Sequence, residues 1–477
     1  MKRLRKYKFQ LLAVLFLLLV LFGYPLWKRI QGQIALARYK QALRARGEAL
    51  TVEEVLASLP ADTNALILSP EEFVALANPA AQLARKIQES EVKPENPPGR
   101  ERAAAVTALL QTFPKLRSRL TNQTIHVLPN YSVGYAEILL PHLGPLKSAI
   151  GAAKIAAEEH LKQGRLDEAL ADVEAGSALA HVLDREPILI SQLLKIACEA
   201  ILLDAVRDAI QTPGWTDAQL ARLQLLLRNQ EVVASALKAM EMERAWDLDL
   251  FPEGSHPLKD ADLNDLLFWE EDDSDLFMEA LSVLRRLALP LNKWKWKHIW
   301  HFEEELFILQ YYDRALDDYK KFLSRKSLAA VLTLQNGEWT WPAKDVFFTR
   351  ARAHKFRWAV VPMVLIDTEG LLRKVAMIQT LIEIGKTAVA LERFRLRHGR
   401  YPKSLRKLIP DFLPALPTDW IDGEPLRYRL DNPGRCRLWS IGLDGADDDG
   451  KGKPNFSSRR NNQETQDVVW ILGKDRP

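Results

Sequence analysis

Aspartates crowd one short segment near the C-terminus: Asp444, Asp447, Asp448 and Asp449. A fifth, Asp467, directly precedes an apolar run that predicts a strand, so the chain can return it beside this loop. Calcium binds six to eight oxygens and mixes carboxylates with backbone carbonyls, so the loop offers suitable ligands. It is no EF-hand, because Gly445 stands where that motif has its first aspartate and no glutamate closes it. A solvated acidic loop without metal is the alternative.

Histidines and cysteines offer weaker patterns. His298 and His301 are spaced as His-x-x-His, but Ile299 stands where zinc peptidases have a glutamate. Cys198 and Cys436 are too few for a zinc site or a disulfide framework. We expect two buried thiols, with one disulfide between domains as the alternative.

The strongly acidic segment 241–275 and the nearby Glu303–Glu305 are a further source of carboxylates. Paired carboxylates can act as general acid and base, so an envelope hydrolase is one functional alternative. The sequence contains no nucleophile elbow, Walker loop, dinucleotide-binding glycines or zincin motif. We therefore expect a protein that is not an enzyme.

Length and composition limit the number of domains and the classes of partner that this chain can have. The chain has 477 residues, which predicts two or three domains. It carries 66 Lys and Arg against 62 Asp and Glu, a net charge of +4. Because no basic stripe with interleaved aromatic residues is present, we expect no nucleic-acid partner.

Residues 9–27 predict a transmembrane helix. Nineteen residues from Phe9 to Trp27 span roughly 28 Å as a helix, close to the thickness of a bilayer core. The apolar run ends at Tyr24, Pro25 and Trp27, which form a poor signal-peptidase cleavage site. Such an end is typical of a signal anchor. The basic residues 1–8 favour a cytoplasmic tail. We expect a single-pass protein of the cell inner membrane, with the lipid bilayer as one partner and most of the chain periplasmic or otherwise extracytoplasmic.

Between the anchor and residue 370 the patterns are mainly helical. Residues 28–145 predict a membrane-proximal stalk over Ile30–Ser58 and then a mixed region, with a linker at Lys93–Gly99. Residues 146–370 predict a helical domain, either a bundle or a short solenoid. Its segment Gly164–Leu170 resembles the turn and second-helix start of a tetratricopeptide repeat, in a single copy.

Tryptophans and lysines alternate over residues 293–300: Lys293, Trp294, Lys295, Trp296, Lys297 and Trp300. Both residue types favour lipid headgroups, so this segment predicts either an interfacial membrane contact or a half-buried edge.

Residues 371–477 predict a small α+β module. A helix begins near Thr368 and ends at Gly399, after about His398. A proline-rich loop follows, and then Leu426–Leu430 and Cys436–Ser440 alternate as an antiparallel hairpin. A final strand is expected at Asp467–Leu472. The fold class is therefore mainly α, with a transmembrane helix and one antiparallel sheet at the C-terminus.

The order of motifs in this module resembles the soluble head of the major pseudopilin of type II secretion systems. The matching segments are Phe394–Pro402, Leu416–Asp419, Gly423–Tyr428, Ser440–Gly445 and the late Asp467. The resemblance covers about residues 371–473. It implies a calcium site in the acidic loop, with Asp444 and Asp467 as ligands by motif position and the Leu443 carbonyl beside them. Asp447 and Asp449 are added on their chemistry alone.

The N-terminus departs from that family. Lys8 precedes Phe9 where pseudopilins are cleaved after a glycine, and Ala13 stands where they have a glutamate. We therefore expect a permanent tether that is not assembled into a pseudopilus. The function expected is a membrane-anchored extracytoplasmic scaffold that binds other proteins, of unknown identity. An accessory role in a type II secretion-like system is a further alternative.

Overall fold

The computed structural model describes residues 23–60, 62, 64–92, 98–134, 137–228, 232–259, 262–263, 289–335, 338–354, 358–361, 365–452 and 467–473. The expected basic tail 1–8 and residues 9–22 of the expected anchor lie outside this part of the chain, as do 93–97 of the expected linker and residues 260–261 and 264–275 of the acidic segment. Among the helices that are described, none combines the length and the apolar character needed to cross a bilayer.

The chain folds into two compact units, each built from segments that are distant in sequence. Unit 1 contains the described residues of Met1–Ser58, Glu241–Leu316 and Ala343–Ile366. Unit 2 contains those of Leu59–Met240, Asp317–Pro342 and Asp367–Pro477. These divisions fall at other places than the expected boundaries at residues 145 and 370.

Unit 1 is helical. It contains α2 (Tyr24–Ala45), α3 (Val52–Ala57), α14 (Lys344–Ala353) and parts of α10 (Val232–Asp249) and α13 (His301–Arg325). Residues 289–295 are also helical and continue through a π-helical turn, η4 (Trp296–Trp300), into α13. The expected helical stalk is confirmed as helix, but it is not free: Leu36 and Leu43 of α2 share a core with Phe302 and Leu309. Gly32 permits this approach, because a Cβ there would lie 3.0 Å from the Phe302 Cβ.

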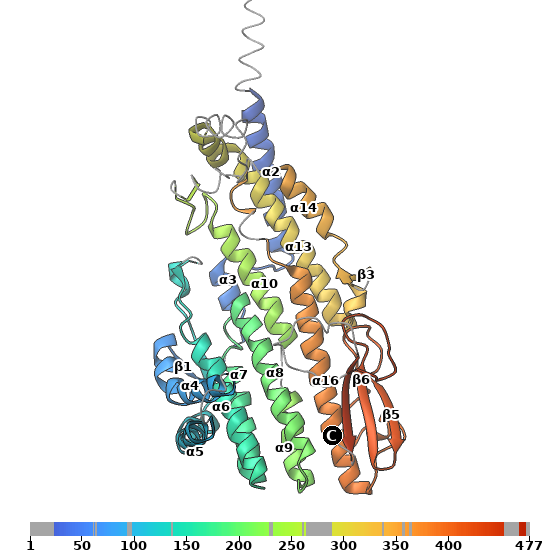
Figure 1. The fold of residues 1–477 in the computed structure, drawn as a ribbon. Coiled ribbons are helices and arrows are strands. Elements are labelled where there is room, and N and C mark those ends of the chain that lie inside the picture. The colour runs from blue at the N-terminus through green and yellow to red at the C-terminus, as the bar shows by residue number, and fades with distance from the viewer. Residues whose placement is uncertain are drawn as a thin grey trace, which may run out of the picture. The chain divides into compact units, whose positions relative to one another are not determined.

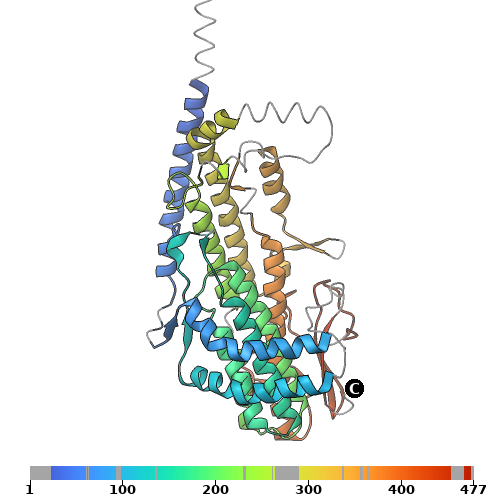
Figure 2. The ribbon, with the colours of Figure 1, turned by 60° about the vertical axis from the view of Figure 1, so that its left-hand side comes forward.

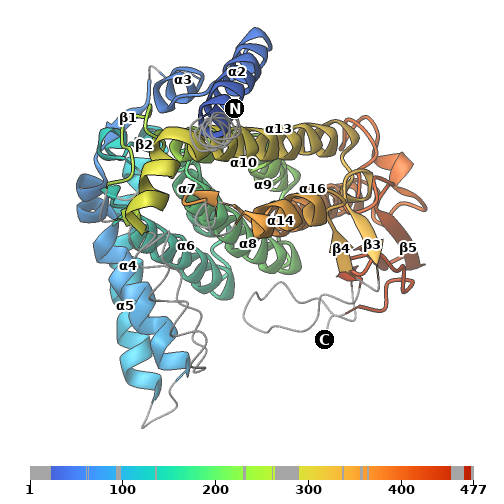
Figure 3. The same ribbon diagram turned by 90° about the horizontal axis from the view of Figure 1, so that it is seen from above.

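Helical hairpins form most of unit 2. They are α4 (Pro70–Val92) with α5 (Pro98–Asn122) and α6 (Leu143–Lys162) with α7 (Leu166–His181). Helices α8 (Leu189–Gln211) and α9 (Asp217–Arg228) follow, and both pack on α7. In addition, α4 contacts α6, and α6 contacts α8. Figure 3 shows α6 and α8 side by side. The predicted turn at Gly164 is confirmed, with φ +72°.

Two long helices, α4 and α5, occupy the region that the sequence indicates as mixed. Pro79 and Pro114 lie inside them. An internal proline destabilises a helix by about 3 kcal/mol, so the sequence pattern predicts breaks in this region. Buried residues at three-to-four spacing outweigh that cost, including Phe73, Ala77, Ala80, Ala84 and Ile87 on α4. Figure 2 shows the α4–α5 pair beside α6.

Small elements complete the helical part of unit 2. The parallel strands β1 (Leu66–Leu68) and β2 (Ile125–Val127) pair the residues before α4 with the residues after α5. Single 3-10 turns are η2 (Tyr131–Val133), η5 (Leu328–Ala330) and η6 (Leu405–Leu408). The antiparallel hairpin β3 (Thr333–Gln335) with β4 (Glu338–Thr340) was not predicted from the sequence.

The C-terminal module has the predicted elements. Helix α16 (Thr368–His398) ends at Gly399, with φ +74°, and its N-cap is Asp367, not Thr368. Strands β5 (Arg427–Asn432), β6 (Arg435–Ser440) and β7 (Val468–Gly473) form one antiparallel sheet in that order. The sheet lies against α16, which in turn packs on α8 and α9 (Figure 1). Ile382, Leu438 and Trp470 therefore share one core with Leu203 and Leu223.

Candidate functional site

The acidic loop follows β6 and turns sharply. Gly442, Gly445 and Gly450 have φ near +70°, and Asp449 has φ +62°, in the left-handed region that favours glycine. The loop is also packed, since a Cβ on Gly445 would lie 2.7 Å from Leu334 Cδ2 in the β3–β4 hairpin. Residues 441–452 are therefore held in one conformation by contacts within unit 2.

Asp467 is the buried acid of this region. Its side chain lies directly before β7 and is only 2% exposed. Oδ2 accepts a hydrogen bond from the Gly450 backbone N–H at 2.8 Å. Oδ1 is buried and has no hydrogen-bond partner among the described residues. Burial raises the pKa of this carboxyl, while the N–H of Gly450 acts in the opposite direction.

The other predicted ligands are engaged elsewhere. Asp447 Oδ1 accepts from Trp439 Nε1 at 3.0 Å, and its Oδ2 lies 3.6 Å from Arg427 Nε. Asp449 pairs with Arg429 at 3.1 Å. Asp444 Oδ1 accepts from the Ala446 N–H at 3.1 Å, a local turn, and Leu443 lies half-buried in the preceding bend.

These five residues do not form a preassembled calcium site. Within the described part of the chain, no three His, Cys, Asp or Glu side chains gather where they could hold a metal ion. Two guanidinium groups instead supply positive charge to the loop carboxylates. Asp467 offers a buried oxygen, Oδ1, that has no hydrogen-bond partner among the described residues. To bind a metal ion, the other acids would have to leave their present partners.

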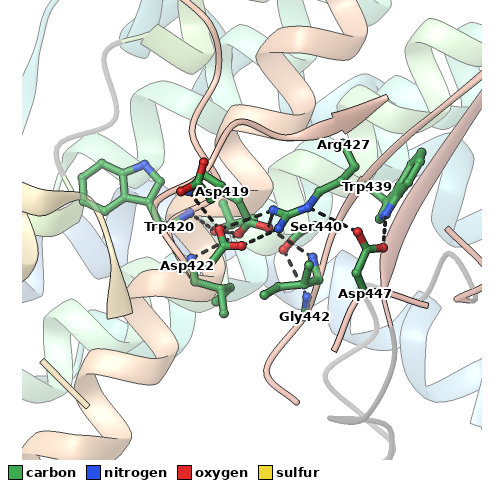
Figure 4. A network of polar contacts seen from close by, with 12 residues as sticks. Asp419, Trp420, Asp422, Arg427, Trp439, Ser440, Gly442 and Asp447 are labelled. Carbon is green, nitrogen blue, oxygen red and sulfur yellow. Dashed lines mark hydrogen bonds and ion pairs between the residues drawn. The ribbon is translucent and has the colours of Figure 1, made fainter. Parts of the chain in front are cut away.

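A second acid, Asp419, organises the base of the same loop (Figure 4). It is fully buried and accepts hydrogen bonds from the Ile421 and Ile441 N–H groups, each at 3.1 Å. Its Oδ2 also pairs with Arg427 Nη1 at 3.0 Å, and Thr380 Oγ1 of α16 donates to its Oδ1 at 3.4 Å. Asp419 thus connects α16, the proline-rich loop and the end of β6.

Arg427 lies between the two parts of this network. Its Nη1 donates to Asp419 Oδ2 and Asp422 Oδ1, and its Nε lies 3.6 Å from Asp447 Oδ2. Its side chain is 20% exposed. Sequence reasoning noted Asp419 and Arg427 within motifs but gave neither a role, because their partners lie on other elements.

A half-buried row of ion pairs lies between α6 and α8, and we call it the polar seam. Its members are Lys154, Glu158, Asp204, Arg207 and Asp208. Lys154 Nζ is 2.9 Å from Asp204 Oδ2, and Arg207 Nη2 is 2.8 Å from Asp204 Oδ1. Side-chain exposures are between 22% and 37%. Burial raises the pKa of both Glu158 and Asp208. With three acids and two bases, the seam carries a formal charge of −1.

Two of the acids considered for hydrolysis, Glu304 and Asp247, are buried in unit 1. Glu304 is fully buried, and its Oε1 accepts from the Val360 and Val361 N–H groups while Oε2 accepts from Trp296 Nε1. Burial raises its pKa to about 7. Asp247 is likewise buried, and burial raises its pKa well above the usual value. The two pKa values move in the same direction, whereas an acid–base pair needs them separated.

The two histidines of the His-x-x-His pattern differ in burial. His298 is exposed, with its ring centroid 5.2 Å from that of Trp294, whereas His301 belongs to the core. His301 is 3% exposed, and burial lowers its pKa to about 4. Cys198 and Cys436 are both buried and free, which confirms the expectation of two buried thiols.

Comparison of the chain with protein-family models, with curated proteins and with solved structures finds no match.

Proposed function

We propose that this protein is a membrane-tethered, extracytoplasmic scaffold that binds another envelope protein at the polar seam. The proposal takes residues 9–27 as the tether and unit 2 as the binding part. The observation that carries it is the row of five half-buried charges between α6 and α8, which are 22% to 37% exposed.

Two features of the seam support protein binding. Its charges are ordered by mutual ion pairs, so a partner loses little side-chain entropy by using them. Its excess of acid favours a partner segment that carries lysine or arginine. The helical hairpins provide a stacked surface of the kind that solenoid proteins use to bind extended segments.

Site-specific photocrosslinking tests this proposal. A benzophenone amino acid at Asp208, in the full-length protein in its native membrane, is expected to crosslink to one discrete protein. The matched control is Arg222 on α9, whose side chain is 57% exposed and lies in the same unit. Lys154→Glu, which disturbs the seam without touching the core, should abolish the crosslink. Equal labelling from both positions, or none from Asp208, would contradict the proposal.

The pseudopilin-like module supports a related role. Its helix, hairpin and final strand follow the order that the resemblance implies, which is compatible with accessory contacts to a secretion-like assembly. The same crosslinking experiment distinguishes this alternative, because a benzophenone at Asp449, which is exposed, would then capture the partner.

We also propose that the acidic loop binds calcium, with Asp444, Asp447, Asp449, Asp467 and the Leu443 carbonyl as candidate ligands. The unpartnered buried Oδ1 of Asp467 supports this proposal. Titration calorimetry with calcium is expected to show binding that Asp467→Asn abolishes and Asp422→Asn keeps. Absence of binding heat, together with a melting temperature that does not rise with calcium, would contradict the proposed calcium site.

A further inference from the structure

A second helix accompanies α2 at its N-terminal end within unit 1. Lys28 Nζ lies 3.0 Å from Glu303 Oε1, and farther along α2 the Tyr39 hydroxyl bonds to Asp313. Because the contacts advance in the same direction on both helices, α2 and α13 run parallel. Residues 289–300, which precede α13, therefore lie toward the start of α2. Figures 1 and 2 both show this olive segment beside the upper end of α2.

This position brings the segment close to the expected membrane span. Trp294 precedes Glu303 by nine residues, or roughly 13 Å along a helix, whereas Tyr24 precedes Lys28 by only four. Trp294 therefore lies at least as far toward the start of α2 as Tyr24 does. Both helices reach the same level of unit 1.

Large apolar side chains are exposed at this level on both helices. On α2, Tyr24 and Leu26 are each 58% exposed and Trp27 is 51% exposed. On the accompanying segment, Trp294 is 54% and Leu291 is 53% exposed. Trp296, by contrast, is 1% exposed and bonds to Glu304, so it belongs to the core.

Basic residues surround these side chains. Lys28 and Arg29 lie on α2, and Lys293, Lys295 and Lys297 lie on the accompanying segment. Lys295 Nζ is 5.5 Å from the centre of the Trp300 ring, and Lys28 Nζ is 5.9 Å from that of Trp27. Tryptophan and lysine together favour the headgroup level of a bilayer, and lysine favours anionic lipids.

We propose that Leu291 and Trp294, with the lysines beside them, dock on the headgroup region of the membrane as a second contact beside the anchor. The inference rests on the anchor of the proposed function. A bilayer fits better than a protein partner, because the exposed residues lie at the level of Tyr24 and Trp27, which follow the apolar run 9–22 in the sequence, and because the lysines complement anionic headgroups. The second contact fixes the tilt and rotation of unit 1 at the surface.

Fluorescent labels on single cysteines test the contact in the full-length protein, reconstituted in vesicles that contain phosphatidylglycerol and brominated lipid. Cys198 and Cys436 are buried, and burial raises the pKa of both thiols, so they add little background labelling. A probe on Trp294→Cys or Leu291→Cys is expected to lose about half of its emission to lipids brominated near the headgroup. Val346→Cys, at a position 70% exposed in the same unit, is the matched control and should remain unquenched.

A probe on Leu17→Cys, inside the expected span, keeps the two proposals separate when the vesicles also contain lipids brominated near the chain ends, because Leu17 would lie near the centre of the bilayer core. Quenching at Leu17 without quenching at Trp294 overturns the second contact and leaves the anchor. Quenching at Trp294 without quenching at Leu17 supports the surface contact and removes the transmembrane span. Equal quenching at Val346 and Trp294 would also overturn the inference, because the contact would not be specific to this segment.

Discussion

At the residue scale, the buried Asp419 connects three parts of the C-terminal module through its contacts with Thr380, Arg427 and the Ile441 N–H. The Ile441 N–H and Arg427 both donate hydrogen bonds to the Asp419 carboxylate. In Asp419→Asn, the side-chain N–H₂, which cannot accept, would face one of these donors. Breaking a buried pair in this way costs about 3–5 kcal/mol. We expect unit 2 to lose roughly that much stability, measured by thermal or denaturant unfolding.

Asp422→Asn is the matched control for this change. Asp422 also contacts Arg427, but its side chain is 20% exposed, so the loss should be about 1 kcal/mol or less. Equal effects of the two substitutions would show that the pairing with Arg427, and not the burial of Asp419, determines the cost.

Glu199 gives the second prediction at this scale. It is fully buried on α8, and neither carboxylate oxygen has a hydrogen-bond partner among the described residues. Burial raises its pKa to about 7, opposed by the nearby Lys195 and His181 and reinforced by Asp184. Because the folded state binds the proton more tightly than the unfolded state, this group stabilises the fold below pH 4.5. That contribution is lost as the pH rises through 7.

Glu199→Gln should remove this dependence. We expect the variant to match the parent near pH 5 and to exceed it by roughly 3 kcal/mol at pH 8, since each pKa unit corresponds to about 1.4 kcal/mol. Melting temperatures of both proteins at the two pH values check this. A parent that is more stable than the variant at pH 8 would contradict the assignment, because it would mean that Lys195 or His181 neutralises the Glu199 carboxylate fully.

At the scale of elements, the α6–α7 turn depends on Gly164. Its φ is +72°, and a Cβ there would meet nothing within 4 Å, so Gly164→Ala introduces backbone strain alone. We expect a loss of about 1 kcal/mol. Gly144→Ala is the control, because Gly144 lies in helix α6 with an ordinary φ and equally open surroundings. It should be neutral or slightly stabilising, and chemical denaturation measures both.

Local signals account for the elements that could be predicted from the sequence. Helix α16 ends at Gly399 in the left-handed conformation, and Pro433–Gly434 turns β5 into β6. Both signals lie within a few residues of the structure they determine. Helices α4 and α5 were missed because Pro79 and Pro114 suggest breaks, and only burial against α6 outweighs them.

The candidate site was predictable in its residue types but not in its partners. The acidic loop and Asp467 stand out by composition. Arg427 and Arg429 pair with Asp447 and Asp449 from about twenty residues away, across a strand pairing whose register no single motif encodes. The role of Asp419 likewise depends on Thr380, which reaches it from α16.

At the scale of the whole molecule, the chain enters unit 1 three times, at Met1–Ser58, Glu241–Leu316 and Ala343–Ile366. A division into contiguous domains cannot find such a unit, because its core pairs Leu43 with Leu309 across more than two hundred residues. The C-terminal module shares its core with α8 and α9, so it behaves as the end of the helical array and not as an independent head.

The orientation of the whole chain in the membrane gives the last prediction. Five basic residues in 1–8 favour retention of the tail in the cytoplasm, so both units should face the other side. In intact spheroplasts, a membrane-impermeant maleimide should label Val346→Cys, which is 70% exposed, and should leave Lys6→Cys unlabelled until the cells are lysed. The parent protein controls for background, since its two thiols are buried. Labelling of Lys6→Cys before lysis, with Val346→Cys protected, would invert the topology and place the polar seam and the acidic loop in the cytoplasm.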